Sequence, residues 1–372
     1  MSSRLRNIVV LCLITILFLG CSSEKKEELN IGFVAGLSGK YSSLGISIRN
    51  GFTLAFDEID YVINNKKITI IEKDDKQNTD DAKEAIEYFV KNDIKLIVGN
   101  ATSAMTKISH SLLENSKDTL LISATASSSE FTQKKDNFLR IQVDKSSRSN
   151  EKLVDYIVNK KFKDTYFIYD SNNKSYVQDY QIILQDLIVK RGGKVFFKNI
   201  DINQPYEVIQ KEIQAKKDDL IIIVANSVDS ASMIQFLRLQ QIKSQVICSG
   251  WAKTYDFLEN GGRAIEGVLF FTGYDDNSED LSFMKFKKYY QLKYNKKPSV
   301  FAAQGYELGK LLIQELEKNK NISTLKQQIL QEKVFDGLQG RIIFNEYGDV
   351  TRDYFFMEVK NGKFVKSKLY ED

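Results

Sequence analysis

Short apolar runs alternate with longer amphipathic stretches from residue 29 onward. Apolar runs of strand length occupy nine ranges: 30–34, 67–71, 96–98, 119–122, 165–169, 194–198, 220–224, 246–248 and 267–271. Stretches with apolar residues at helical spacing lie between them, at 46–59, 81–91, 104–114, 151–159, 176–190, 206–215 and 229–241. Strands that alternate with helices favour parallel sheets built from right-handed strand–helix–strand units. The sequence therefore predicts an α/β fold.

The last third of the chain departs from this alternation. Two long helical patterns, at 281–294 and 301–318, precede short β-prone runs at 341–344, 354–359 and 363–368. Turn residues separate these runs, which predicts antiparallel strands near the C-terminal end. No Pro-, Gly- or Ser-rich linker occurs along the chain. The sequence therefore favours two domains joined by several short crossings over two domains joined by a single linker.

The first 28 residues have the pattern of an export signal followed by a tether. Arg4 and Arg6 precede an apolar run at 8–19, which ends in Gly20 and Cys21. The run is shorter than the roughly 20 residues of a membrane-spanning helix, so it predicts a signal peptide over 1–20. The sequence Leu-Phe-Leu-Gly-Cys resembles the bacterial lipobox. This resemblance implies that Cys21 is lipidated after cleavage and that the polar residues 21–28 tether the folded part.

The expected location follows from this segment. The mature chain is expected to be exported to the cell envelope and lipid-anchored to a membrane, facing the periplasm or the extracellular side. A plain secretory peptide and an uncleaved anchor are the alternatives.

Composition excludes several classes of function. The chain has 53 Lys and Arg against 49 Asp and Glu, a formal net charge of +4, which gives no strong basic footprint for nucleic acid. The single histidine, His110, excludes a multi-histidine metal site, and no acid or nucleophile lies near it in the sequence. With Cys12 in the signal and Cys21 acylated, Cys248 has no partner for an intramolecular disulfide. These counts lead us to expect that the protein is not an enzyme.

Motifs for cofactors and metals are also missing. The Gly-rich opening at 31–51 invites a phosphate-loop interpretation, but Gly39-Lys40 is followed by Tyr41, and neither a Walker A nor a dinucleotide pattern is complete. The oxygen-rich run at 275–280 lacks the glycine that a calcium loop of the EF-hand type needs at its sixth position. We therefore expect no cofactor and no metal.

Two hydroxyl-rich loops are the strongest candidates for a binding site. Thr102 and Ser103 follow the strand predicted at 96–98, and Ser127 lies in a Ser/Thr-rich run that follows the strand predicted at 119–122. Ligands of open α/β sheets bind beyond the carboxyl ends of the strands, where a helix start offers free N–H groups to an anion. The loops thus favour a small carboxylate as ligand. The alternative is that these hydroxyls only cap the helices that follow.

Beyond these loops, the sequence resembles a known family over nearly all of the mature chain. It is similar to type I solute-binding proteins of ABC transporters, and specifically to the branched-chain amino acid binding group. Besides the two loops, the segments that carry the resemblance are IGFVAGLSG at 31–39 with Gly45 and 50–51, SGWA at 249–252, GGRAIEGV at 261–268, AAQGY at 302–306, FDGLQG at 335–340 and FNEYGD at 344–349. The resemblance implies two Rossmann-like lobes with parallel sheets, joined by three hinge crossings around a ligand cleft. It places lobe one at 29–143 plus 273–333 and lobe two at 144–272 plus 334–372.

The same resemblance implies how one end of the ligand is held. Ser103 and Ser127 would bond a carboxylate, assisted by N–H groups near Thr102 and Ser127. The carbonyl of Ala126 and the hydroxyl of Ser127 would meet an ammonium group. Such a site suits a zwitterion, because charge-assisted hydrogen bonds are about twice as strong as neutral ones.

Further ligand contacts are implied on both sides of the cleft. Tyr176 would close over the ligand from lobe two, while Leu44 and Trp251 would line the side-chain pocket. Trp251, the only Trp, would supply a large apolar wall. The position aligned with the family's ammonium-binding acid carries no acid here, and Asp229, with Asn226 close by, is the candidate substitute. Tyr176 as a surface residue, Trp251 as a core residue and Asp229 as a helix start are the structural alternatives.

The function expected from these residues and this resemblance is solute capture. The lobes would close on a small amino acid, branched-chain or otherwise aliphatic, and the lipoprotein would deliver it to an ABC permease in the membrane. A receptor that signals to a separate membrane partner and a binder of a different small carboxylate are the alternatives.

Overall fold

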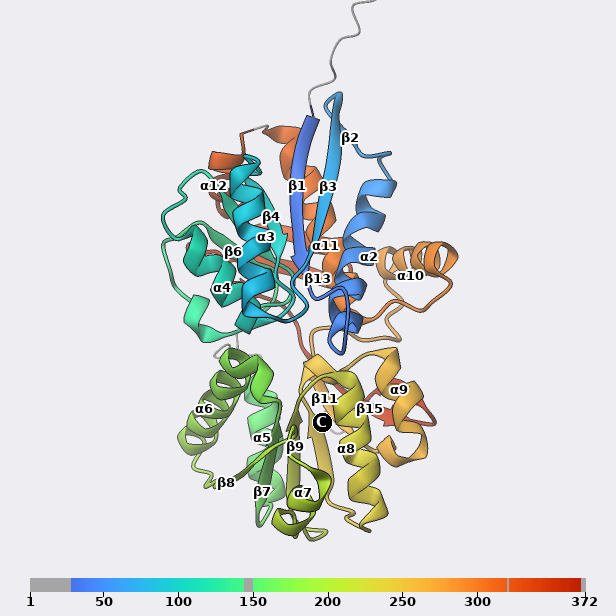
Figure 1. Cartoon of the computed structure of the whole chain (residues 1–372). Coiled ribbons are helices and arrows are strands. Elements are labelled where there is room, and N and C mark those ends of the chain that lie inside the picture. Colours follow the sequence, from blue (N-terminus) through green and yellow to red (C-terminus); the bar gives the residue numbers. More distant parts are fainter. Residues whose placement is uncertain (1–27, 144–149, 320, 369–372) are drawn as a thin grey trace, which may run out of the picture.

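The computed structural model describes residues 28–143, 150–319 and 321–368, which form two lobes stacked end to end (Figure 1). The predicted signal peptide, Cys21 and most of the predicted tether lie outside these ranges. The first strand starts at the end of lobe one that points away from lobe two (Figure 1).

Lobe one contains a six-stranded sheet in the order β2-β3-β1-β4-β5-β6. Five of its strands are parallel, namely β3 (Lys66–Asp74), β1 (Glu28–Ala35), β4 (Leu96–Gly99), β5 (Leu120–Ser123) and β6 (Phe138–Arg140), while the short edge strand β2 (Val62–Ile63) is antiparallel. The helices of this lobe are α2 (Ser42–Asp57), α3 (Thr79–Lys91), α4 (Ser103–Leu113), α10 (Leu281–Tyr294), α11 (Val300–Lys318) and α12 (Ile322–Glu332).

Successive side chains of each strand pack alternately into two separate layers of the hydrophobic core. Phe33 packs its ring against Phe52 of α2, with ring centroids 5.8 Å apart. The next residue, Val34, belongs to the opposite layer with Ile86 and Phe89 of α3. Because successive side chains of a strand point to opposite faces, α2 covers one face of the sheet and α3 covers the other.

Helices α2 and α11 approach each other closely because both carry glycine at the contact. A side-chain carbon on Gly51 would lie 1.8 Å from the Ala302 carbonyl oxygen, and one on Gly305 would lie 2.1 Å from that of Ile48. Only glycine fits such a backbone approach. This contact fixes the position of the first turns of α11, which face the space between the lobes.

Lobe two contains a seven-stranded sheet in the order β16-β15-β11-β10-β9-β7-β8. Its parallel strands are β11 (Leu269–Thr272), β10 (Gln245–Cys248), β9 (Leu220–Val224), β7 (Thr165–Tyr169) and β8 (Phe197–Asp201), and β15 (Phe355–Lys360) and β16 (Lys363–Lys366) add an antiparallel edge. The helices are α5 (Glu151–Lys160), α6 (Lys174–Lys190), α7 (Tyr206–Glu212), α8 (Ser227–Leu239) and α9 (Tyr255–Gly261). The two parallel sheets confirm the predicted α/β class. Cys248 is a buried free thiol.

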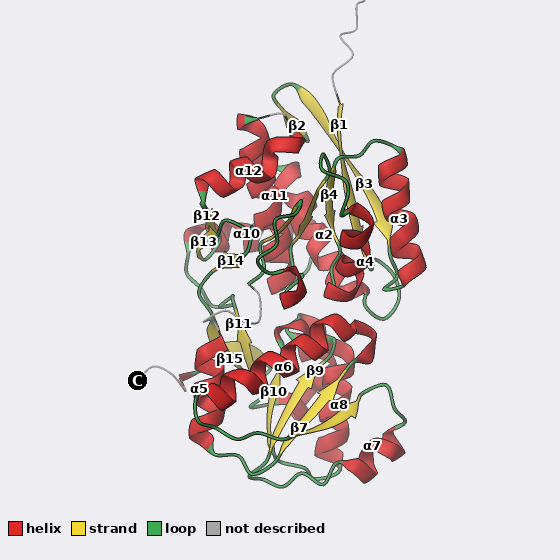
Figure 2. Cartoon of the chain, turned by 90° about the vertical axis from the view of Figure 1, so that its left-hand side faces the viewer, coloured by secondary structure: helices red, strands yellow, loops and turns green. Residues whose placement is uncertain are grey.

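A third, small antiparallel sheet lies near one of the predicted lobe boundaries. It consists of β12 (Val334–Gly337), β13 (Gly340–Phe344) and β14 (Val350–Thr351) and lies beside lobe one (Figure 2). Asp349, which precedes β14, accepts a hydrogen bond of 2.6 Å from Nη2 of the buried Arg140 in β6. The segment 334–351, which was predicted to belong to lobe two, thus contacts lobe one, where the Asp349 carboxylate compensates the buried guanidinium charge.

The chain passes between the lobes three times: between β6 and α5, between β11 and α10, and between β14 and β15. A buried carboxylate on α11 ties the second and third crossings to lobe one. Glu307 accepts two hydrogen bonds from Arg352, at 2.9 and 3.1 Å, and one of 2.7 Å from the Leu338 N–H group. The Tyr274 hydroxyl also donates to Glu307. Because Tyr274 follows β11 and Arg352 follows β14, this cluster anchors both crossings at one point.

The only histidine has a structural place in lobe one. His110 Nε2 lies 2.8 Å from Asp136 Oδ2. Nζ of the mostly buried Lys326 donates hydrogen bonds to the carbonyls of Asp136 and Phe138, at 2.7 and 2.8 Å. Burial alone would raise the pKa of Asp136, but the hydrogen bond from His110 and the charge of Lys326 outweigh burial and hold that pKa below its usual range.

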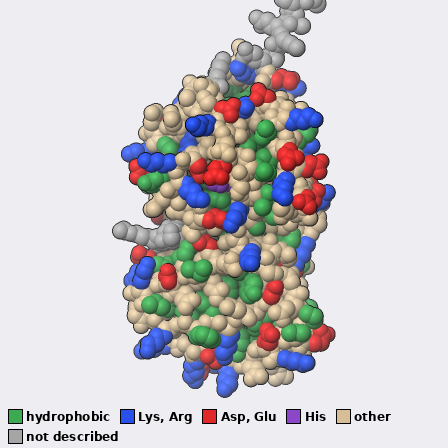
Figure 3. All heavy atoms as spheres, turned by 60° about the vertical axis from the view of Figure 1, so that its left-hand side comes forward, with side chains coloured by type: hydrophobic (Ala, Val, Ile, Leu, Met, Phe, Trp, Pro, Cys, Tyr) green, Lys and Arg blue, Asp and Glu red, His purple; other side chains and the backbone are tan. Residues whose placement is uncertain are grey.

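The surface agrees with the balanced composition. On the face shown in Figure 3, basic and acidic side chains are interspersed over both lobes. None of the helices within the described ranges is both long enough and apolar enough to span a bilayer.

Candidate ligand-binding cleft

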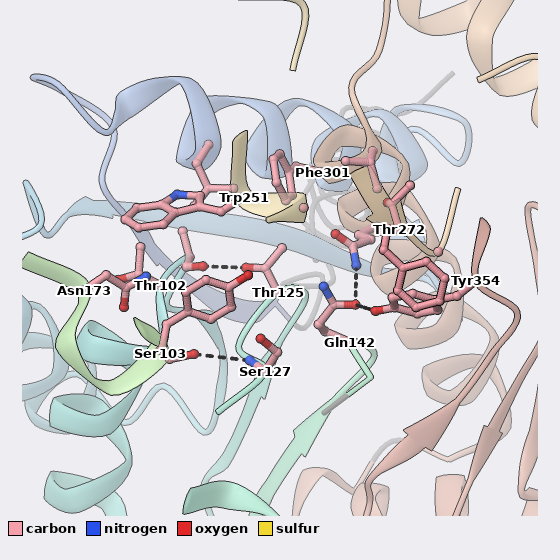
Figure 4. A pocket seen from close by; sticks show the side chains of 18 residues that line it. Thr102, Ser103, Thr125, Ser127, Gln142, Asn173, Trp251, Thr272, Phe301 and Tyr354 are labelled. Atoms are coloured by element: carbon pink, nitrogen blue, oxygen red, sulfur yellow. Dashed lines mark hydrogen bonds between the residues drawn. The ribbon is translucent and has the colours of Figure 1, made fainter. Parts of the chain in front are cut away.

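The two lobes enclose a cavity at the carboxyl ends of β4 and β5 in lobe one and of β10 and β11 in lobe two (Figure 4). The lining residues are Leu44, Ala101, Thr102, Ser103, Thr125, Ser127, Gln142, Asn173, Tyr176, Gly250, Trp251, Phe271, Thr272, Gly273, Val300, Phe301, Gln304 and Tyr354. None of these lining side chains carries a formal charge. A charged ligand group must therefore be held by hydroxyls, amides and backbone dipoles.

The two predicted hydroxyl loops meet at one end of this cavity. Thr102 caps α4, and its hydroxyl oxygen accepts from the Met105 N–H group while donating to Gln77 Oε1 at 2.9 Å. Ser103 Oγ accepts hydrogen bonds from the N–H groups of Ser127 and Ser128, at 3.2 and 3.3 Å (Figure 4). Thr102 thus caps α4 and also lines the cavity, which Ser103 and Ser127 face together.

The rest of the second loop is held by its own hydroxyls. Ser123 Oγ donates to the Asn100 carbonyl at 2.9 Å, and Thr125 Oγ1 donates to the Ala101 carbonyl at 2.6 Å. Ala126 is fully buried, its N–H group bonds Ser123 Oγ at 3.0 Å, and its side chain does not line the cavity. Within the part of the chain that the structure describes, the Ser127 hydroxyl forms no hydrogen bond, so it remains available to a ligand.

Aromatic side chains cover the cavity from lobe two. Trp251 stacks on Tyr41 of lobe one, with ring centroids 6.2 Å apart and an interplanar angle of 16°. Tyr176 meets the Trp251 ring edge-on at 5.9 Å. Leu44 and Phe301 line the cavity from lobe one. The structure therefore brings the predicted residues Leu44, Tyr176 and Trp251 into one cavity with Ser103 and Ser127.

Two predicted contacts lie elsewhere. Asn226 caps α8 by accepting from the N–H groups of Val228 and Asp229, each at 3.0 Å. Asp229 Oδ2 lies 2.6 Å from Lys40 Nζ of lobe one. Neither residue lines the cavity. Asp229, the predicted substitute for the family's ammonium-binding acid, therefore lies outside the cavity and forms an ion pair between the lobes.

Several polar contacts cross from one lobe to the other and hold the cleft closed. The Tyr41 hydroxyl donates a 2.9 Å hydrogen bond to Oδ2 of Asp170, which is fully buried in lobe two. Burial and the nearby Asp170 charge raise the pKa of Tyr41, which keeps this donor protonated. The Ala104 N–H group of α4 donates to Asn173 Oδ1 at 3.2 Å. The structure thus describes the closed arrangement of the lobes.

The other end of the cavity was not predicted from the sequence, and it is built at the hinge. Gln142 follows β6, Thr272 ends β11 and Tyr354 precedes β15, so each of the three crossings supplies one lining residue. Gln304 comes from α11 and donates from Nε2 to Gln142 Oε1 at 3.1 Å. The sequence marks the segment at 302–306 only as part of the family resemblance. Its small residues, which allow α11 to approach α2, were the available signal.

A comparison with known families identifies the chain. A family model described as periplasmic binding protein matches residues 28–363. The chain belongs to this family. Its members are binding proteins, which confirms the expectation that this protein is not an enzyme, and the family implies a location outside the cytoplasm. A comparison of the sequence with curated protein sequences found no match.

Solved structures of this family share the fold. A leucine-binding protein of Thermotoga maritima superposes with a TM-score of 0.81 at 19% identity, covering 91% of this chain and 97% of that one. A branched-chain amino acid transporter substrate-binding protein of Streptococcus pneumoniae, in complex with isoleucine, has a TM-score of 0.81 at 21% identity, covering 92% and 100%. An ABC transporter solute-binding protein of R. palustris, in complex with benzoate, has a TM-score of 0.79 at 17% identity, covering 91% and 95%. These likenesses confirm the type I periplasmic binding protein fold.

The described residues also offer no metal centre. Within 28–143, 150–319 and 321–368, no three His, Cys, Asp or Glu side chains are grouped as metal ligands would be.

Proposed function

We propose that this protein captures a small solute bearing a carboxylate, an amino acid in the first place, and delivers it to an ABC permease in the membrane. The observation that carries the proposal is the pairing of Ser103 and Ser127 at the N-terminal end of α4, inside a cavity that both lobes cover. A helix N-terminus carries about half a positive charge and free N–H groups. Together with two hydroxyl donors, it suits a carboxylate.

The balance of charges in the cavity sets the character of the ligand. An amino acid zwitterion has no net charge, so it can enter a cavity whose lining is formally neutral. Its ammonium would be met by neutral acceptors, among them the Ser127 hydroxyl and the Ala126 carbonyl that the family resemblance implies. The leucine-binding and isoleucine-bound neighbours of the same fold support this choice.

A carboxylate without an ammonium group is the second candidate. It is favoured by the lack of an acidic lining residue, together with the aromatic walls of Trp251, Tyr176 and Phe301. Aromatic ligands gain from offset or edge-on contacts with such rings. The neighbour of the same fold in complex with benzoate supports it.

The anchoring and delivery parts of the proposal rest on the sequence. Lipidation at Cys21 would hold the protein at the membrane through residues 21–28, and lobe closure would prepare the solute for release to a permease. A receptor that signals to a separate membrane partner would use the same closure. Replacement of Cys21 by Ala should move the protein from the detergent phase to the aqueous phase; an unchanged partition would contradict the anchor.

The lobes are proposed to extend over 29–143 plus 273–351 and over 144–272 plus 352–372. These ranges keep two of the sequence-based boundaries and move the third to residue 351. The packing of β12–β14 against lobe one supports the change.

A thermal-shift screen of the exported chain tests the proposed ligand class. The panel holds amino acids, aromatic carboxylates, sugars and short peptides. A ligand at 100 times its Kd stabilises the native state by about 2.7 kcal/mol, which raises the melting temperature by several degrees. A carboxylate should give this rise. If only a sugar does so, the proposed ligand class fails although the fold stands.

A further inference from the structure

The hinge end of the cavity is polar, although an aliphatic ligand side chain would need an apolar pocket there. In Figure 4, Gln142, Thr272 and Tyr354 lie on the opposite side of the cavity from Ser103. Gln304 lines the same cavity and contacts Gln142. Two amides and two hydroxyls thus come together where the far end of a ligand would lie, beside the ring of Phe271, which contacts Tyr354.

The orientation of the Gln142 amide is fixed by three donors. Its Oε1 accepts from Gln304 Nε2 at 3.1 Å, from the Tyr354 hydroxyl at 3.3 Å and from the Val143 N–H group at 3.2 Å. A flipped amide would set its NH₂ group against the Val143 donor. The Gln142 nitrogen therefore points away from Tyr354, toward the middle of the cavity, as Figure 4 shows. This nitrogen is a hydrogen-bond donor offered to the ligand.

The Gln304 amide offers the complementary acceptor. Gln304 is only 2% exposed, and because its Nε2 is committed to Gln142, its Oε1 is left buried without a hydrogen-bond partner in the described part of the chain. A buried carbonyl oxygen that stays unpaired is costly, and native structures contain few of them. The pairing therefore leaves one amide donor on Gln142 and one amide acceptor on Gln304, and both residues line the cavity.

We propose that the end of the ligand remote from Ser103 carries a group that both donates and accepts hydrogen bonds, a carboxamide or a hydroxyl, held between the Gln142 and Gln304 amides. This inference rests on the proposed capture of a carboxylate and specifies the rest of the molecule. It departs from the aliphatic amino acid expected from the sequence. An aliphatic end would leave both amide groups unpaired, and sites built to hydrogen-bond a polar group reject apolar analogues strongly.

Two pairs of nearly isosteric compounds test the inference by calorimetry on the exported chain. Asparagine and leucine differ by a carboxamide against two methyl groups, and 4-hydroxybenzoate and 4-methylbenzoate differ by a hydroxyl against a methyl group. In the pair that binds, the polar member should bind at least tenfold more tightly. Whichever pair binds also shows whether the polar group arrives on an amino acid or on an aromatic carboxylate.

A variant assigns the preference to the hinge end. Gln304→Met keeps the length of the side chain and removes its amide, so the preference should fall to about threefold or less. Gln314→Met is the matched control, because Gln314 lies on the same helix, contacts Glu315 and does not line the cavity. This control should keep the wild-type preference.

The outcomes separate the two levels of the proposal. Equal affinities within a pair, or a tighter apolar member, overturn the polar end while the carboxylate site stands. An undiminished preference in Gln304→Met overturns the assignment to this amide. If no carboxylate of the panel binds, the proposed function fails and the inference fails with it. The comparison of isosteres uses the unmodified protein, so it decides the matter even if a variant does not fold.

Discussion

Removal of one hydroxyl at the cleft should weaken ligand binding without weakening either lobe. The Tyr41 hydroxyl reaches across from lobe one to Oδ2 of Asp170 at 2.9 Å. The other carboxylate oxygen of Asp170 is held within lobe two by Asn172 and Asn203, at 2.9 to 3.0 Å. Tyr41→Phe keeps the ring that stacks on Trp251. The substitution therefore removes only the bond between the lobes.

The magnitude follows from the nature of that bond. A hydrogen bond to a charged group contributes about 1.5–3 kcal/mol. This bond exists only in the closed form, so its loss lowers the closed population of a protein whose lobes open and close. Because about 1.4 kcal/mol corresponds to a tenfold change in affinity, Tyr41→Phe should weaken the affinity about 10- to 150-fold. The partial exposure of Tyr41 favours the lower half of this range.

A matched variant separates closure from general stability. Tyr306 donates a 2.7 Å hydrogen bond to Glu58, and both residues belong to lobe one. Calorimetry with the best ligand of the screen should show an unchanged affinity for Tyr306→Phe and a weaker one for Tyr41→Phe. Urea unfolding should show the reverse order of destabilisation. If Tyr41→Phe binds as tightly as the wild type, the contact does not contribute to closure and the reasoning is refuted.

Three further predictions concern the anchor end, the hinge and the acid stability. Ser103→Ala and Ser127→Ala should each weaken the free energy of ligand binding by about 1–3 kcal/mol, which calorimetry measures. An unchanged affinity in both variants would remove the carboxylate assignment. Glu307→Gln leaves the buried Arg352 uncompensated and should lower the free energy of unfolding by about 3–5 kcal/mol, and a loss below about 1 kcal/mol in urea titrations would contradict the hinge cluster. The pKa of Asp136 is depressed below 3.8 in the native state, so its stabilisation is present above the unfolded pKa and is lost as the pH falls through the native pKa. Asp136→Asn should therefore flatten the loss of stability below about pH 4, and parallel pH profiles of the two proteins would contradict this role.

The α/β architecture was predictable because local patterns of apolar residues indicate most of its strands and helices. Strands β7 (Thr165–Tyr169) and β9 (Leu220–Val224) coincide with the predicted ranges 165–169 and 220–224, since both are unbroken apolar runs. Strand β8 lies at Phe197–Asp201 rather than at 194–198, because its half-exposed edge position weakens the apolar signal. Strand β6 (Phe138–Arg140) was missed because it is short and contains Arg140, whose buried charge pairs with the distant Asp349.

The cleft was predictable only where its residues follow predicted strands. Ser103 and Ser127 stand at strand ends, which general rules for α/β sheets mark as binding positions. No general rule identifies Gln142 and Gln304 as binding positions, because the three crossings bring them together from distant parts of the chain. The ion pair of Asp229 was not predictable for the same reason: its partner Lys40 lies in the other lobe, and no local pattern reveals that pairing.

The most direct test of solute capture in this cleft uses the emission of Trp251. It is the only Trp of the chain, it lines the cavity, and it contacts Tyr41 across the cleft. Titration with the carboxylate that raises the melting temperature should change the emission in a saturable way, with the midpoint that calorimetry gives. A ligand that stabilises the protein while the emission stays constant would bind elsewhere, and this result would contradict the account.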